Sequence, residues 1–490
     1  MPLSAGIPAR SNSFRVVFKL DLLVPPQGFK ANPGLKLANA FSVESKSNSG
    51  LNHIFIVANP EGGPFYQNFA RYLTARSFDP YLKGSRSMYD AIIVGARCAG
   101  SPLAMLLARK GYKVLLLDKA TFPSDTISTH HIHQPGVERL GRWGLLDQIQ
   151  ASNCPATTQI KFDVGPFALV GTPPPAGDNA EAYAPRRRVL DKILVDVAAG
   201  AELREGFSVD EITHDGTTVT GIRGHDRNGP AVQESARVVI GADGARSFVA
   251  NAVHAPVYLD RGMLTCNYYS YWNGVPVEGA ELYPRAGRMV VVDKTNDGLT
   301  LVVVVWPVAE FQRVRGNVEA EFMRELRKNV PALAKRLEGG RREERFAGTG
   351  YIPNFLRKPF GSGWALVGDA GYHKDPITAQ GITNSFSHAE MLAAALDEGF
   401  SGSQPMLKAL AGYERRRNEE VLPMFEHTVR LAKLELPPPE MLHLMNALRG
   451  NQEETGRFLG TVTGTVSIPE FFAPENIRRV IGASALTHAA

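Results

Sequence analysis

Residues 89–100 read Tyr-Asp-Ala-Ile-Ile-Val-Gly-Ala-Arg-Cys-Ala-Gly, which predicts a strand, a tight turn and the start of a helix. Gly95 permits the turn, and Gly100 allows the helix to pack closely against the strand. The N-terminus of such a helix presents unpaired N–H groups to a pyrophosphate. Arg97 stands at the middle position, where this fingerprint normally has glycine so that the backbone can approach phosphate. Our hypothesis is that its guanidinium pairs with the diphosphate directly.

The next apolar run, Lys113–Leu117, ends at Asp118. A carboxylate at this position accepts hydrogen bonds from ribose hydroxyls and repels a 2′-phosphate, which favours FAD or NAD over NADP. Strand, helix and second strand together predict the beginning of a nucleotide-binding βαβ unit. The alternative is an ordinary glycine turn between two buried segments.

A second motif is Val238-Val-Ile-Gly-Ala-Asp-Gly-Ala-Arg-Ser247. Its apolar half predicts a strand, so Asp243 and Gly244 lie at a strand end, where ligands of open α/β sheets bind. An ordinary Asp-Gly turn is the alternative for this motif alone.

The third motif extends from Trp364 to Gly381 and contains Gly368, Asp369 and Pro376. It predicts a strand, a Gly-Asp turn, a loop and a long helix that begins after Gly381. A carboxylate at the turn can accept hydrogen bonds from ribityl hydroxyls. The positive end of the helix can face a flavin pyrimidine and stabilise the reduced, anionic ring.

These motifs, in this order, resemble the single-component (group A) flavin monooxygenases, typified by para-hydroxybenzoate hydroxylase, and the related geranylgeranyl-reductase-like proteins. The resemblance covers about residues 88–400. It implies an α/β fold. This fold has a Rossmann-like FAD-binding domain of three layers (two of β-structure and one of helices, ββα), an inserted mixed β-sheet substrate domain and a helical C-terminus.

The resemblance also implies a function. FAD would bind non-covalently, NAD(P)H would dock transiently as electron donor, and O₂ would form a flavin hydroperoxide that hydroxylates a small apolar or aromatic molecule. The motifs specify FAD but not one reaction. A geranylgeranyl-reductase-like C=C reductase and a non-catalytic flavin-binding redox sensor are therefore the alternatives.

Several cofactor contacts follow from the same resemblance. Arg188, ahead of a predicted helix, matches a family arginine that contacts FAD. Two positions depart from the family pattern: Ala250 stands where a second arginine is frequent, and Thr383 where asparagine is usual. The implied cofactor-binding residues are Gly95, Arg97, Gly100, Asp118, Arg188, Asp243, Gly244, Gly368, Asp369, Pro376 and Gly381.

The cluster Thr129-His-His-Ile-His133 matches no standard zinc spacing, so we predict no metal site. By resemblance it lies near the isoalloxazine ring, and His130 or His131 could relay a proton. His373, after the Gly-Asp turn, is a third candidate. For all three, a structural histidine is the alternative.

The composition bounds the remaining expectations. Residues 1–87 carry ten Lys/Arg and four Asp/Glu, and the whole chain carries 54 and 49. Residues 88–490 therefore have 44 and 45, a net charge of −1, which gives no electrostatic case for binding nucleic acid. The longest apolar run, Leu299–Val308, is too short to span a bilayer. Three dispersed cysteines fit a reducing compartment, and we expect a cytoplasmic protein.

The chain is predicted to have four parts. Residues 1–87 lack a sustained period and are expected to be a disordered or artefactual extension, with an organelle-targeting peptide as the alternative. The remaining parts are an FAD-binding domain (88–153, 183–255 and 348–400), a substrate domain (154–182 and 256–347) and a helical C-terminal region (401–490).

Overall fold

The computed structural model describes residues 17–21, 41–48, 51–58 and 88–487. The chain divides into two compact units, Met1–Arg86 and Ser87–Ala490. In the first unit, three antiparallel strands pair in the order β1-β3-β2. The prediction of a disordered or artefactual extension otherwise falls on residues outside the described ranges. The three strands are β1 (Val17–Asp21), β2 (Phe41–Asn48) and β3 (Leu51–Ala58).

A parallel sheet forms the centre of the second unit. Its middle strands are almost entirely apolar, and Ile92 and Ile93 are fully buried, as expected for a sheet that is covered on both faces. The strands pair in the spatial order β10 (Glu202–Glu205), β5 (Val114–Asp118), β4 (Tyr89–Val94), β13 (Ala231–Gly241) and β23 (Trp364–Leu366), with β22 (Phe360–Gly361) antiparallel to β23.

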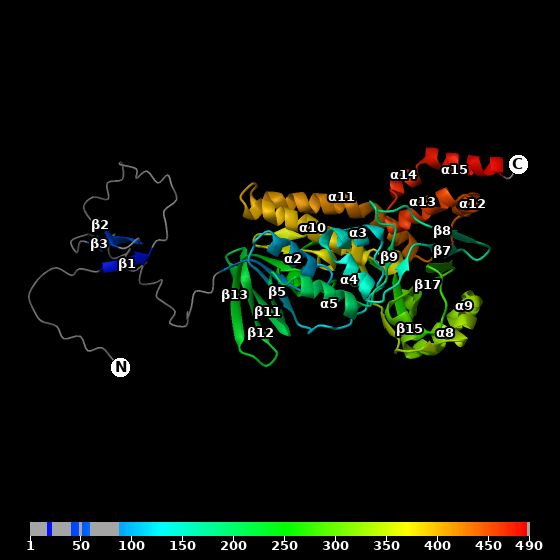
Figure 1. The fold of residues 1–490 in the computed structure, drawn as a ribbon, viewed down its shortest axis with the longest axis horizontal. Coiled ribbons are helices and arrows are strands. Elements are labelled where there is room, and N and C mark those ends of the chain that lie inside the picture. The colour runs from blue at the N-terminus through cyan, green and yellow to red at the C-terminus, as the bar shows by residue number, and fades with distance from the viewer. Residues whose placement is uncertain (1–16, 22–40, 49–50, 59–87, 488–490) are drawn as a thin grey trace, which may run out of the picture. The chain divides into compact units, whose positions relative to one another are not determined.

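Helices cover one face of this sheet and an antiparallel meander covers the other (Figure 1). Strand β13 belongs to both layers, because its first half pairs with β12 and its second half with β4. This arrangement confirms the predicted three-layer ββα domain. The helices are α2 (Gly100–Arg109), α5 (Arg187–Val197), α10 (Gly381–Phe400) and α11 (Met406–Ala432), and the meander is β11 (Phe207–Asp215), β12 (Thr218–Asp226) and β13.

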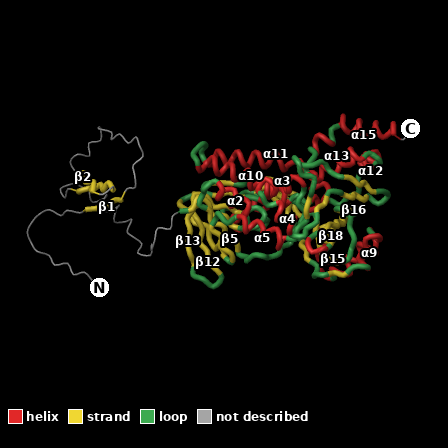
Figure 2. The backbone as a smooth tube through the Cα atoms, in the orientation of Figure 1, coloured by secondary structure: helices red, strands yellow, loops and turns green. Residues whose placement is uncertain are grey.

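A second, mixed sheet is inserted into this domain. Its pairs are antiparallel except for β16 with β7, which run parallel. Trp272 and Trp306 on one face pack against Phe322 of α8 (Val318–Asn329) and, with α9 (Pro331–Glu338), form a separate core. The strand order is β19 (Arg341–Arg342), β15 (Thr265–Asn273), β18 (Thr300–Pro307), β17 (Arg288–Lys294), β16 (Ala280–Arg285), β7 (Ile160–Asp163) and β8 (Ala168–Gly171), and β20 (Ala347–Thr349) pairs with β15. Figure 2 shows the helix α9 beside the strands β15 and β18.

The C-terminal region is helical, as predicted. Phe458 packs against Phe162 of β7, and Phe471 packs against Phe458, so the region covers one end of the inserted sheet. Its helices are α12 (Pro439–Leu448), α13 (Gln452–Thr463), α14 (Ile468–Phe471) and α15 (Pro474–Thr487). None of the helices in the described part of the chain combines the length and apolarity that a bilayer span requires.

Shorter elements connect the two sheets. Strand β14 pairs with β21, and β21 with β24, in a small sheet that joins segments predicted to lie in different domains. The predicted domain boundaries therefore remain predictions. The connecting elements are α3 (Gln134–Trp143), α4 (Leu146–Ala151), β6 (Ala156–Thr157), β9 (Ala182–Tyr183), α6 (Phe248–Ala252), β14 (Val257–Met263), α7 (Phe311–Gly316), β21 (Pro353–Arg357) and β24 (Tyr372–His373).

Candidate cofactor site

One cavity of about 760 Å³ brings the three sequence motifs together. It lies at the carboxyl ends of β4, β5, β13 and β23, which meet at one edge because these strands are parallel. Gly95, Asp118, Asp243 and Gly368 each follow or end one of these strands and line the cavity. Residues far apart in sequence are thus adjacent in space.

The first motif needs glycine at both ends for steric reasons. Gly95 has a φ of +107°, and a Cβ there would lie 2.4 Å from the carbonyl oxygen of Ala242. A Cβ on Gly100 would lie 1.8 Å from the carbonyl oxygen of Gly95. The turn therefore lets α2 begin directly against the sheet, and the residues just before the helix, Arg97, Cys98 and Ala99, line the cavity, where a phosphate would bind.

Asp118 stabilises this turn from the neighbouring strand. Its two carboxylate oxygens accept the backbone N–H groups of Ala96 and Ala120, each at 2.8 Å. The side chain is largely buried but lines the cavity. Since a carboxylate has about four acceptor sites, lone pairs remain for ribose hydroxyls.

Two arginines, Arg97 and Arg187, meet on one buried carboxylate beside the turn. The Arg97 guanidinium lies 2.5 Å from Asp191, and that of Arg187 lies 2.9 Å from the same residue. Asp191 is fully buried, and both arginines line the cavity. Their ion pairs hold the two guanidinium groups at the cavity wall, where they could face a diphosphate.

The structure corrects the predicted arginine on the following helix. Arg188 is exposed and lies outside the cavity wall, whereas Arg187 is buried in it. Successive helical residues point about 100° apart, so only one of the two can face inward. The arginine predicted from sequence, Arg188, is thus one residue away from Arg187, the arginine that lies in the cavity wall, and the sequence alone did not distinguish the two.

The second motif contributes an unsatisfied acceptor. Asp243 accepts the N–H of Val249 at 3.1 Å through one oxygen, while the other oxygen is buried without a protein partner. Burial raises the pKa of this carboxyl. Such an orphaned oxygen in a cavity wall fits a ligand hydroxyl, because a buried acceptor normally has a donor.

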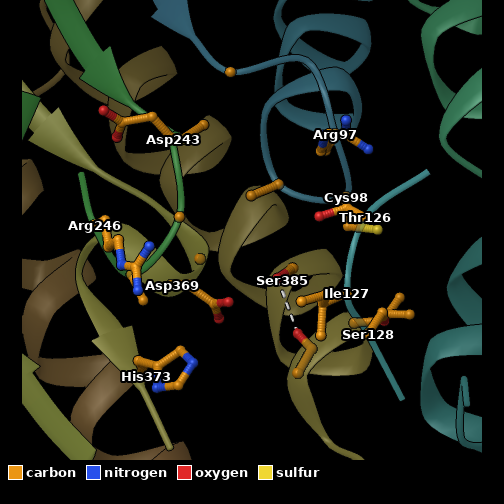
Figure 3. Close-up of a pocket in the computed structure, with 18 of the residues that line it drawn as sticks. Arg97, Cys98, Thr126, Ile127, Ser128, Asp243, Arg246, Asp369, His373 and Ser385 are labelled. Atoms are coloured by element: carbon orange, nitrogen blue, oxygen red, sulfur yellow. Dashed lines mark hydrogen bonds between the residues drawn. The ribbon is translucent and has the colours of Figure 1, made fainter. Parts of the chain in front are cut away.

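The third motif closes the cavity against the first. Gly368 has a φ of +59°, and a Cβ there would lie 2.7 Å from the Cβ of Ala99. Asp369, Pro376 and Gly381 all line the cavity. Figure 3 shows Asp243, Arg246, Asp369 and His373 on one side, facing Arg97, Cys98 and the segment 126–128 on the other.

The three candidate histidines have different positions. His373 lines the cavity and contacts the carbonyl oxygen of Pro353 through Nδ1. His130 and His131 are buried and do not line the cavity, although the preceding Ser128 and Thr129 do, so the expectation that this stretch lies near the ring stays a prediction.

His130 and His131 bind protein groups instead. Nε2 of His130 lies 2.7 Å from the hydroxyl of Tyr271, and Nδ1 of His131 lies 2.6 Å from Asp293. Burial lowers the pKa of His130 to about 3, so its ring is neutral at pH 7. Nowhere in the described residues do three His, Cys, Asp or Glu side chains gather closely enough to hold a metal ion.

Sequence reasoning missed other residues of the cavity wall. Thr383, noted as a departure from the family pattern, accepts the N–H of His133 instead, while Asn384 faces the cavity. For four of them, Lys374, Asp375, Asn384 and His388, the only sequence signal was proximity to the third motif. Asn267 and Val303 also line the cavity, together with Tyr269, an aromatic residue for which the sequence left open a place in an apolar pocket or in the core.

The structural features fit FAD: a glycine turn at a helix N-terminus, a carboxylate at the tip of the second strand, two arginines and an orphaned acceptor. Comparison with known proteins agrees. The family described as "FAD binding domain" matches residues 88–426.

Individual relatives are distant. A digeranylgeranylglycerophospholipid reductase of Methanocella arvoryzae is 25% identical, over 68% of this chain and 84% of the relative. Conditioned medium factor receptor 1 of Dictyostelium discoideum is 23% identical, over 67% of each chain.

Solved structures show the same fold. The flavin-dependent brominase Bmp2 superimposes with a TM-score of 0.69 at 18% identity, over 82% of this chain and all of the other. PqsL of Pseudomonas aeruginosa, a probable FAD-dependent monooxygenase, gives 0.59 at 21% identity, over 76% of this chain and 99% of the other. The chain therefore belongs to the FAD-binding-domain family and is an FAD-dependent oxidoreductase.

Proposed function

We propose that this oxidoreductase is a monooxygenase that accepts electrons from NAD(P)H and hydroxylates a small apolar or aromatic molecule. The observation that carries the proposal is the continuity of the cavity. It extends from Asp118 at the nucleotide end to the inner face of the inserted sheet, where Tyr269 and Val303 line it. A small substrate and the flavin ring would thus share one continuous cavity.

The proposed cofactor contacts follow from the cavity wall. Asp118 would bind the adenosine ribose, Arg97 and Arg187 the diphosphate, and Asp243 and Asp369 the ribityl hydroxyls. When bound, FAD supplies the redox chemistry, and the chain supplies binding, orientation and exclusion of water.

The substrate end is suited to a largely apolar molecule. Tyr269 is buried beside Val303 on the neighbouring strand, and Asn267 adds one polar group. Burial raises the pKa of Tyr269 to about 12, so its hydroxyl remains protonated at neutral pH and can donate a hydrogen bond. Apolar walls with few polar groups are typical of small-molecule sites.

A C=C reductase of the geranylgeranyl-reductase type is the second candidate. The digeranylgeranylglycerophospholipid reductase match covers most of the length of that relative, which favours this reaction. Both reactions require electron delivery to FAD, and they differ in the molecule that receives those electrons: O₂ in the oxygenase, a C=C bond in the reductase.

The test uses purified protein loaded with FAD. Flavin absorbance is followed anaerobically with NADH and with NADPH, and air is then admitted with rapid mixing. Bleaching, followed by a transient absorbance band before the oxidised spectrum returns, supports the monooxygenase. Direct return of the oxidised spectrum favours the reductase, and absence of bleaching with either nucleotide refutes NAD(P)H as donor.

A further inference from the structure

Lys374 is a buried basic residue in the cavity wall that makes no ion pair with a carboxylate in the part of the chain that the structure describes. It lies between β24 and the short 3₁₀ helix η4 (Pro376–Thr378), and its residue surface is 7% exposed. Its ammonium donates a hydrogen bond to the side-chain oxygen of Asn384 at 2.7 Å. Among the described residues, no carboxylate forms an ion pair with it.

The nearest acidic residues do not neutralise this charge by contact. Asp375 directs its carboxylate to the hydroxyl of Thr265 at 2.6 Å and to the N–H of Ile377 at 3.1 Å. Asp369 lines the cavity and acts on Lys374 only through its longer-range field. Burial therefore dominates and lowers the pKa of Lys374 to about 7.

The surroundings make this cation still less favourable in the empty cavity. Asn384, its hydrogen-bond partner, lies in the first turn of α10, which begins at Gly381. A helix N-terminus carries a partial positive charge, so two positive ends meet in a desolvated place. A buried positive charge that has no anion in contact is destabilising, and the same group becomes stabilising when an anion enters.

His388 cannot take this role. It also lines the cavity, and neither ring nitrogen has a hydrogen-bond partner. Burial and the nearby charges of Arg417, Lys374 and Arg139 hold its pKa well below the usual range. The imidazole is therefore neutral at pH 7, whereas Lys374, with a pKa of about 7, is still partly protonated and is the group that can carry positive charge at this end.

Lys374 also lines the end of the cavity that is distant from the proposed nucleotide end. Asp118 and the first glycine turn line the proposed nucleotide end of the cavity, so the flavin ring of bound FAD would lie toward the Pro376 segment and α10, which line the same cavity. We propose that the Lys374 ammonium stabilises the negative charge that the flavin ring carries in reduced FAD, and so shifts bound FAD toward its reduced form. This inference rests on FAD binding and holds for an oxygenase and for a reductase.

Two equilibrium measurements test the proposal without any substrate. Lys374→Met removes the charge and keeps much of the side-chain volume. We expect the reduction potential of bound FAD to fall by about 30 mV or more, which corresponds to a tenfold change in a two-electron equilibrium. Sulfite adds reversibly to oxidised flavin and leaves negative charge on the ring, so its dissociation constant should rise about tenfold, a change of about 1.4 kcal/mol in binding free energy.

The matched control is Lys358→Met. Lys358 is partly buried but forms an ion pair with Glu414 at 2.5 Å, and it lies outside the cavity wall. Its replacement should leave both quantities unchanged. FAD content, measured by absorbance after gel filtration, separates loss of the cofactor from a change in its potential.

Each outcome is decisive. A lower potential and weaker sulfite binding in Lys374→Met, with the FAD content retained, support the proposal. An unchanged potential and sulfite constant overturn it. If Lys374→Met does not fold, Lys374→Gln, which keeps a donor for Asn384, is measured with the same expectations and the same criterion for rejection.

Discussion

The carboxylate of Asp118, at the tip of one strand, holds the backbone N–H of Ala96, which follows the neighbouring strand, at a distance of 2.8 Å. This bond joins the end of β5 to the glycine turn before α2. The turn that faces the cofactor cavity is therefore shaped by the same residue that is proposed to bind the ribose.

Asp118→Ala should thus impair both structure and binding. The change removes acceptors from two backbone N–H groups, Ala96 and Ala120, in a largely buried place. Hydrogen bonds to charged groups contribute about 1.5–3 kcal/mol each, so we expect a loss of about 2 kcal/mol or more in the free energy of unfolding. FAD affinity, measured by fluorescence titration, should fall at least about tenfold. Wild-type affinity in a folded variant would refute the role of Asp118.

Gly100→Ala should prevent the close approach of α2 to the sheet. The added Cβ would meet the carbonyl of Gly95 at 1.8 Å, a backbone atom that cannot move aside without breaking the turn. Overpacking of this kind typically destabilises by about 1–3 kcal/mol, and FAD should be lost on gel filtration. Gly316→Ala is the control, since a Cβ there meets nothing within 4 Å and the site lies away from the cavity.

Arg187→Met and Arg188→Met should differ strongly in their effects on FAD affinity and on the stability of the fold. Arg187 is buried in the cavity wall on Asp191, whereas Arg188 is exposed. Removing Arg187 leaves Asp191 with Arg97 alone, so we expect weaker FAD binding and a stability loss of about 3 kcal/mol. Arg188→Met should match the wild type in calorimetry and in FAD titration. Equal effects of the two changes would contradict the placement.

The stability of the fold should depend on His427 in mildly acidic solution. Burial and nearby Arg430 lower the pKa of this histidine from 6.5 to about 4. Between these values the unfolded chain binds a proton that the folded chain does not, so stability falls as the pH decreases from about 6.5 to about 4. Above pH 6.5 both states are neutral and the group contributes no pH dependence.

His427→Leu should remove this part of the pH dependence. The difference in unfolding free energy between variant and wild type should shift in favour of the variant by up to about 3 kcal/mol as the pH falls from 7 to 4. Urea unfolding at closely spaced pH values measures this difference. Parallel stability curves for the two proteins would show that His427 is not held neutral by the fold.

Local sequence patterns determined most of the secondary structure. The strand predicted before Gly95 is β4 (Tyr89–Val94), and the apolar run Lys113–Leu117 differs from β5 (Val114–Asp118) by one residue at each end. The long helix predicted to begin after Gly381 is α10, which begins at Gly381. The spacing of apolar residues and the positions of glycine turns predict these elements, because each helix or strand buries one of its faces and ends at a turn.

The sequence also determined the cofactor class. Three separate strand-and-turn motifs predicted an FAD-binding domain, and glycine at positions 95 and 100 was necessary because no side chain fits there. These constraints are local: a turn angle, a close backbone approach, a carboxylate at a strand end.

Only the tertiary structure decided which side chains face the cavity. Arg187 rather than Arg188 reaches it, His130 and His131 are buried outside its wall, and Lys374 is buried in the wall with no carboxylate ion pair among the described residues. Side-chain direction changes by about 100° per helical residue, and burial depends on segments distant in the chain. A single sequence encodes the local turns directly, but the electrostatic environment of each group arises only when β15, α10 and the Pro376 segment meet around one cavity.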